Sequence, residues 1–198
     1  MLLQIYIKMD TTQHQAPVLK LFMLLLGCKP PGRHIEQHDI FFGIGENIQD
    51  LVPAMKEYWP GGRIHIDAWR EVNTVEGWQV NVVPKETTTT QPTEKLFFIN
   101  LGGYQHNKFE EQHYILLTVK PNKGAAFREA KNTLFYQHNH IEGGTSHIDD
   151  QYGVDVDDLY QIEEMLSPQL KAQYTISLKQ VDNLAEDALH LGYIKLME

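Results

Sequence analysis

Two short motifs, each present twice, hold the residue types that could do chemistry. Glu36-Gln37-His38 recurs as Glu111-Gln112-His113, and His65-Ile66-Asp67 recurs as His147-Ile148-Asp149. In an extended strand, residues i and i+2 project from the same face, about 6.5–7 Å apart along the backbone. Each motif is therefore expected to present one imidazole and one carboxylate on the same side of a sheet.

If the strands that carry the two motifs are neighbours, each copy gathers two imidazoles and two carboxylates. Such a set suits a divalent transition metal, with one position left for water or substrate. Without a metal, a His–carboxylate pair suits general acid–base chemistry, because the carboxylate fixes the imidazole tautomer. A third interpretation is structural, with polar pairs that only fix the strand register. The candidate residues are Glu36, His38, His65 and Asp67, with second-copy counterparts Glu111, His113, His147 and Asp149.

A loop arginine precedes the first motif. Arg33 and Lys108 occupy equivalent positions in the two copies, so Arg33 could hold an anionic substrate while His38 or His65 acts as a base or metal ligand. A solvated loop charge is the competing interpretation of Arg33.

The motifs belong to a longer repeat. A shift of 75 positions aligns Lys20–His38 with Lys95–His113 and gives eight identities in nineteen positions without a gap, where chance gives about one. The second pair of motifs follows after an insertion of seven residues in the second copy. The sequence therefore predicts two tandem copies of one unit.

The elements that must position these motifs follow from hydrophobic periodicity and from turn residues. The fold class we predict is α+β, with two pseudo-symmetric β-β-α-β-β units and small, mainly antiparallel sheets. The predicted segments are an N-terminal extension (1–17), a first unit (18–84), a Thr-rich linker (85–94), a second unit with a helical insertion (95–180) and a C-terminal tail (181–198).

Strands and helices are expected at corresponding places in the two units. In the first, we predict strands at 20–26, 38–43, 63–72 and 78–83 and a helix at 47–58. In the second, we predict strands at 96–100, 113–119 and 174–178, a helix at 124–136 and another through Leu159, Ile162 and Met165. The tail is expected to add a short helix and a strand at 193–197.

The amino-acid composition limits the kinds of partner that the protein is expected to bind. The net charge is −9 without a basic stripe, which argues against nucleic acid and anionic membranes. Neither of the apolar runs near the N-terminus approaches the roughly 20 residues of a membrane span. Cys28 is the only cysteine, which excludes an intramolecular disulfide and fits a reducing compartment. We therefore expect a cytoplasmic protein that binds a small molecule or a metal ion, and leave a homodimer open.

Three stretches of the first unit carry a resemblance to a known family. They are Lys20 to Cys28, Gly32 to Asp39 and His65 to Val72, and together they resemble the bacterial domain-of-unknown-function family 1543. The resemblance implies a bacterial, soluble, duplicated α+β protein without an assigned activity, and it donates no catalytic roles. In the second unit Tyr114 replaces Asp39, so a site that uses Asp39 would survive only in the first.

Three functions remain open from the sequence. The first is a binding protein for a small ligand or divalent metal, the second a metal-dependent or acid–base hydrolase, and the third a non-catalytic structural or interaction module. Binding or catalysis predicts that the four polar side chains converge on a solvent-reachable pocket. The structural interpretation predicts that they are buried and hydrogen-bonded to one another.

Overall fold

The computed structural model of the protein describes residues 18–87, 93–104, 109–132 and 154–196. Within these residues the strands form three sheets in which neighbouring strands are antiparallel, and short helices connect them. The predicted α+β class is confirmed.

The first sheet has the strand order β10-β3-β1-β2. A 3₁₀ helix and a short α-helix lead from β2 to β3, where the acidic side chain of Asp50 accepts the backbone N–H of Asn47 at 3.1 Å and so caps the first turn. The elements are β1 (Lys20–Cys28), β2 (Gln37–Gly45), η1 (Ile48–Leu51), α1 (Val52–Tyr58), β3 (His65–Glu71) and β10 (His190–Lys195).

The second sheet, with the order β7-β6-β8, repeats the arrangement of β2, β1 and β3. Lys20 pairs with Gly45 in the first hairpin, and Lys95 pairs with Lys120 in the second, 75 positions further on in both strands. The Asn122 side chain accepts the N–H of Ala125 at 2.9 Å and caps the helix, as its position between a strand and a helix predicts. The elements are β6 (Lys95–Tyr104), β7 (Glu111–Lys120), α2 (Lys123–Lys131) and β8 (Val154–Gln161).

A third, smaller sheet joins the two halves. In its strand order, β4-β5-β9, one strand from each half pairs along seven residue positions. The elements are β4 (Thr74–Val75), β5 (Trp78–Pro84), η2 (Lys85–Thr87), α4 (Ile162–Met165), α5 (Pro168–Gln173) and β9 (Tyr174–Gln180).

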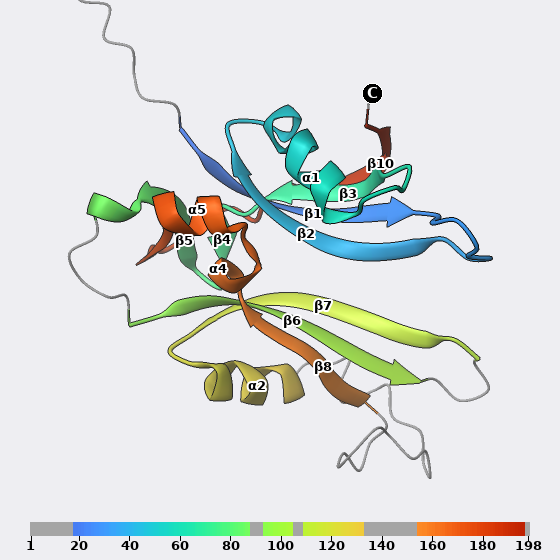
Figure 1. Cartoon of the computed structure of the whole chain (residues 1–198). Coiled ribbons are helices and arrows are strands. Elements are labelled where there is room, and N and C mark those ends of the chain that lie inside the picture. Colours follow the sequence, from blue (N-terminus) through green and yellow to red (C-terminus); the bar gives the residue numbers. More distant parts are fainter. Residues whose placement is uncertain (1–17, 88–92, 105–108, 133–153, 197–198) are drawn as a thin grey trace, which may run out of the picture.

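The two larger sheets face each other, and a helix covers the outer face of each (Figure 1). Alternation along the strands decides which side chains meet. On β1, Phe22 and Leu24 pack with Met55 of α1, whereas Leu21 and Met23 point toward the second sheet. The core between the sheets also holds side chains of β2, β6 and β7, among them Ile40, Phe42, Ile44, Leu96, Phe98, Leu117 and Val119.

Two predicted helices differ from the structure. The acidic stretch 155–158 and Leu159 lie in strand β8, which pairs with β6, so helix α4 begins only at Ile162. The tail forms no helix between residues 181 and 189. Instead, the Asp187 carboxylate accepts the N–H of Asn73 at 3.0 Å, and β10 then pairs with β3.

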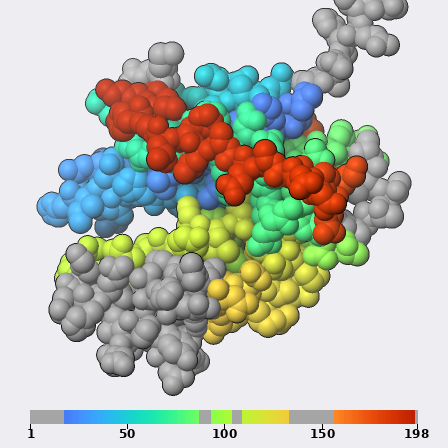
Figure 2. Space-filling model, turned by 180° about the vertical axis from the view of Figure 1, so that it is seen from behind, coloured from blue at the N-terminus to red at the C-terminus, as the bar shows by residue number. Residues whose placement is uncertain are grey.

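This return of the tail covers one face of the molecule. Figure 2 shows the C-terminal segment in red across the back of the first half. In the described part of the chain, no helix has the length and apolar character to cross a membrane.

Candidate functional site

The four candidate side chains of the first half converge at one end of the first sheet. His38 Nε2 lies 3.2 Å from Asp67 Oδ2 and 3.8 Å from Glu36 Oε2. His65 Nε2 lies 3.3 Å from Asp67 Oδ1 and 3.4 Å from Glu36 Oε1. Two carboxylates therefore stand between two imidazoles, each with one oxygen near each ring.

Strand register explains this convergence. Gly27 in β1 pairs with His38 on one side and with His65 on the other, so both imidazoles flank the same glycine. β3 bulges opposite Leu25 and Leu26, and Asp67 is the additional residue without a paired position in β1.

Position 27 requires a glycine because the side chains of His65 and Asp67 lie directly against its backbone. A Cβ there would lie 2.6 Å from Asp67 Oδ2 and 2.8 Å from His65 Cε1. Distances below 3.0 Å are essentially never seen for real Cβ atoms. The cluster therefore rests directly on the backbone of Gly27, and any larger residue would displace it.

The exposure of the four side chains is graded. His65 is 5% exposed and Asp67 26%, while Glu36 and His38 reach 43% and 46%. The His65 ring also packs against the Tyr193 ring of β10, with centroids 4.2 Å apart. One imidazole is thus fixed and buried, and the other side of the cluster is open to solvent.

Two buried atoms of the cluster lack hydrogen bonds. His65 Nε2 and Asp67 Oδ2 are inaccessible to solvent and make none within the structure, although oxygens and nitrogens lie 3.2–3.4 Å away. The contacts are close, but their directions do not suit hydrogen bonds. A buried polar group without a hydrogen bond lowers the stability of the fold by about 1–3 kcal/mol. The contacts within the cluster therefore do not explain why these two atoms are buried.

A related cluster stands on the second sheet. His113 Nε2 lies 3.8 Å from Glu111 Oε2, and His113 Nδ1 lies 3.6 Å from Asp157 Oδ2. A Cβ at Gly102 would lie 2.8 Å from Glu111 Oε1, as at its equivalent Gly27. Gly27 and Gly102 are identical positions of the two aligned sequence segments that also carry Glu36-Gln37-His38 and Glu111-Gln112-His113. This identity was the sequence signal that could have singled out the two glycines.

Register gives different second-half counterparts from those that the repeated tripeptide predicts. Gly102 pairs with Asp155 as Gly27 pairs with His65, and a matching bulge precedes Leu101. Asp155 and Asp157 therefore occupy the positions of His65 and Asp67. The predicted counterparts His147 and Asp149 lie outside the described residues.

A cavity of about 390 Å³ lies between the two clusters. His38 and His113 both line it, together with Leu25, Asn100 and other side chains of both sheets. In Figure 2 the opening appears at the left, between the blue and the yellow-green halves. His38, the more exposed imidazole of the first cluster, and His113 of the second therefore face a solvent-reachable space, which the binding and catalytic interpretations require.

The remaining candidates lie elsewhere. Arg33 is exposed in the turn after β1, where its N–H donates to Pro30 O at 3.2 Å. Cys28 is fully buried among the side chains that pack on α1, on the opposite face of β1 from the cluster. Burial, and secondarily the charge of Glu36, raises the pKa of the Cys28 thiol. A buried, protonated thiol is a poor nucleophile.

The cluster is not a preformed metal cage. Among the residues that the structure describes, no three His, Cys, Asp or Glu side chains are arranged so that they could hold a metal ion as they stand. The two half-exposed side chains, Glu36 and His38, would have to turn for all four donors to meet one ion.

Residues 33–82 match the family model "Domain of Unknown Function (DUF1543)". This segment contains Glu36, His38, His65 and Asp67, so the whole first cluster lies within it. This segment of the chain is therefore similar to the DUF1543 family. Among curated proteins, none matches the chain.

A solved structure has the same fold. The chain is similar to protein Il1583 from Idiomarina loihiensis, with a TM-score of 0.58 and 20% sequence identity. The match covers 91% of this chain and 99% of the other. At this identity the likeness concerns the fold alone.

Proposed function

We propose that this protein binds a divalent transition metal through Glu36, His38, His65 and Asp67. The observation that carries the proposal is the state of His65 Nε2. It is buried, it has carboxylate oxygens at 3.3 and 3.4 Å, and it makes no hydrogen bond.

A metal accounts for these distances better than a hydrogen-bonded network does. Zinc bonds to imidazole nitrogen and carboxylate oxygen are about 2.0–2.2 Å long, which places ligand atoms of a tetrahedral site about 3.3–3.5 Å apart. Three of the four distances between imidazole nitrogens and carboxylate oxygens are 3.2–3.4 Å, and the fourth is 3.8 Å. Ligand atoms of one ion lie at such distances from one another without forming hydrogen bonds between them.

The adjustment needed to close the site falls on exposed side chains. Glu36 and His38 are nearly half exposed, so turning them displaces no core residue. His65 and Asp67 would stay in place, held by Gly27 and by the Tyr193 ring. The site would then close on the ion, with two fixed ligands and two recruited ones.

The donor set favours zinc. Two nitrogens and two oxygens without a thiolate suit zinc, nickel, manganese or iron, and a tetrahedral arrangement is typical of zinc. Copper and nickel prefer square-planar or tetragonal sites. The half-exposed edge of the cluster faces the cavity, so a small ligand could reach the ion from there.

Elemental analysis of untagged protein, followed by calorimetric titration with zinc, tests the proposal. We expect one zinc per chain and a loss of affinity of more than about 100-fold in His38→Ala, because even second-shell changes cost about 10–100-fold. His38 is exposed enough for alanine to leave the fold intact. His34→Ala, which removes an exposed loop imidazole outside the cluster, is the matched control and should bind zinc normally.

Two results would reject the metal site. One is the absence of bound zinc, manganese, iron or nickel after incubation with each ion. The other is equal zinc affinity in the parent protein, His38→Ala and His34→Ala. The alternative hydrolase would use the same His–carboxylate pairs and requires turnover that disappears in His38→Ala. The structural alternative predicts lost stability in His38→Ala without any effect on a ligand.

A further inference from the structure

A second cavity at the seam between the halves has a different lining. Its volume is about 400 Å³, and it is formed by strand β2 and Tyr58 from one side and by β6, β8 and α4 from the other. It shares Asp39, Ile40, Phe98 and Asp158 with the cavity beside the imidazoles, so the two spaces adjoin. Its lining is Asp39, Ile40, Phe41, Phe42, Tyr58, Phe98, Asp158, Tyr160, Glu164 and Met165.

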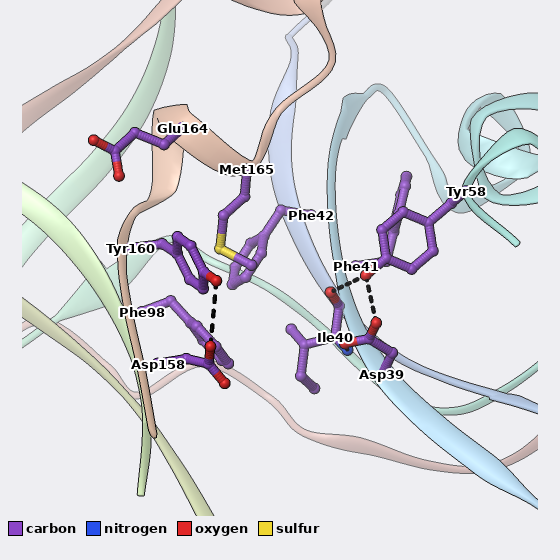
Figure 3. Close-up of a pocket in the computed structure, with 10 residues that line it drawn as sticks. All are labelled: Asp39, Ile40, Phe41, Phe42, Tyr58, Phe98, Asp158, Tyr160, Glu164 and Met165. Atoms are coloured by element: carbon purple, nitrogen blue, oxygen red, sulfur yellow. Dashed lines mark hydrogen bonds between the residues drawn. The ribbon is translucent and has the colours of Figure 1, made fainter. Parts of the chain in front are cut away.

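Two tyrosine–aspartate pairs face each other across this space (Figure 3). On the first half, Tyr58 Oη donates to Asp39 Oδ2 at 2.7 Å. On the second half, Tyr160 Oη donates to Asp158 Oδ1 at 3.2 Å, and Asn100 Nδ2 donates to the other oxygen at 3.3 Å. Each aspartate is thus oriented by uncharged donors, with the backbone N–H of Ile40 also donating to Asp39 Oδ1 at 2.7 Å.

Protonated phenols maintain this arrangement. Burial, and then the hydrogen bond and charge of Asp39, raises the pKa of Tyr58 above its ordinary value. The charge of Asp158 likewise raises the pKa of Tyr160. Both phenols therefore remain hydrogen-bond donors at neutral pH.

The two aspartates of the cavity have no ion-pair partner among the described residues. No ion pair between described residues includes Asp39 or Asp158. Glu164, the third carboxylate of the lining, is already paired with Lys123 at 2.8 Å. No lysine or arginine lines the cavity. An anionic ligand would meet two uncompensated carboxylates there.

Aromatic rings supply the other walls. Tyr58, Tyr160, Phe41, Phe42 and Phe98 all line the space. Aromatic faces attract cations through their quadrupole, and combinations of rings with carboxylates recognise ammonium groups. We propose that the cavity between Asp39 and Asp158 binds an organic cation, the ammonium group of a small molecule.

This site does not depend on the metal. A titration with butylammonium chloride, followed by amide chemical shifts of labelled protein in excess EDTA, tests it directly. Pentanol and pentanoate serve as neutral and anionic probes of slightly larger size. We expect saturable shifts around Tyr58 and Tyr160 with butylammonium and none with pentanoate.

Variants separate the site from general attraction to an acidic protein. Asp39→Asn and Asp158→Asn should each weaken butylammonium binding about tenfold or more, because each removes a charge-assisted contact. Tyr160→Leu should weaken it about two- to fivefold through the lost ring. Glu186→Gln, the loss of one charge at an exposed position away from the cavity, should leave affinity unchanged.

The same spectra report whether each variant is folded, because dispersed amide resonances require the native core. Unchanged affinity in both aspartate variants, or equal shifts with pentanol, would overturn the proposal. If Glu186→Gln lost as much affinity for butylammonium as Asp39→Asn, the binding would depend on the net charge of the protein alone. That result would also overturn the proposal.

Discussion

The clusters over Gly27 and Gly102 stand on equivalent strands but differ in one position. The first has the buried imidazole of His65, which packs against Tyr193 of the tail. At the equivalent register position the second has Asp155. The tail therefore fixes a buried imidazole in the first half, whereas the second half has an aspartate at the register position of His65.

The difference indicates how one backbone arrangement can present two donor sets. In both halves a bulge follows the same point of the central strand, and a glycine lies beneath the polar side chains. The register fixes where the donors stand, and the residue types at those positions fix which ion would bind. Imidazole favours zinc and similar ions, while sets dominated by carboxylates favour manganese, magnesium or calcium.

Breaking the contact between the halves should have the largest effect on stability. Phe98 of β6 packs edge-on against Phe42 of β2, with ring centroids 5.7 Å apart, and both are buried. Phe98→Ala should lower the free energy of unfolding by about 3–5 kcal/mol through lost burial and a cavity. Urea denaturation measures this. A change below about 1 kcal/mol would show that the two sheets do not depend on their shared core.

Adding a methyl group at Gly27 or at Gly102 should show which of the two clusters binds zinc. Gly27→Ala places a methyl group against His65 and Asp67, and we expect it to abolish zinc binding and to cost about 1–3 kcal/mol through overpacking. Gly102→Ala crowds the second cluster in the same way and should leave zinc affinity at the first unchanged. Calorimetric titration of both variants compares them. Equal loss of zinc in the two would contradict the separation.

Exchanging the residues at the register position shared by His65 and Asp155 tests whether that position decides which metal each half binds. Asp155→His gives the second half the residue types of the first at all four positions, and we expect a second zinc equivalent to bind. The reverse exchange, His65→Asp, should lower zinc affinity while retaining manganese binding. Titrations with the two metals measure the stoichiometry. A stoichiometry unaffected by Asp155→His would mean that register equivalence does not extend to the side chains.

A smaller effect is expected at alkaline pH. The pKa of Tyr58 is raised in the folded protein, chiefly by burial, so folding favours the protonated phenol. This contribution to stability is complete below the unfolded pKa of about 10 and is lost as the pH rises above it. Tyr58→Phe should therefore show a shallower fall of unfolding free energy between about pH 9 and 11. Parallel curves for the two proteins would contradict the assignment.

The sequence predicted the strands that carry the first cluster, because their apolar runs and the punctuating Gly and Pro residues are local signals. It also predicted that Glu36 and His38, and His65 and Asp67, would share a face. The path of the tail was not predictable, because the pairing of β10 with β3 depends on contacts across more than 100 positions.

In the second half, motif and register point to different residues. The tripeptide at His147 lies outside the described residues, whereas Asp155 and Asp157 stand at the register positions of His65 and Asp67. The Asp155-Val156-Asp157 sequence matches a His-x-Asp motif only at its last residue. Only the strand register therefore identifies Asp155 and Asp157 as the counterparts of His65 and Asp67. The seam cavity of Asp39 and Asp158 was missed for a related reason, because its two sides come from segments 119 positions apart.

Nitrogen NMR of the histidine rings tests most directly whether His65 Nε2 is a metal ligand. Zinc added to labelled protein should shift the Nε2 resonances of His65 and His38 until one equivalent is bound, while those of His34 and His190 remain in place. Unchanged His65 resonances at saturating zinc would contradict the proposed site.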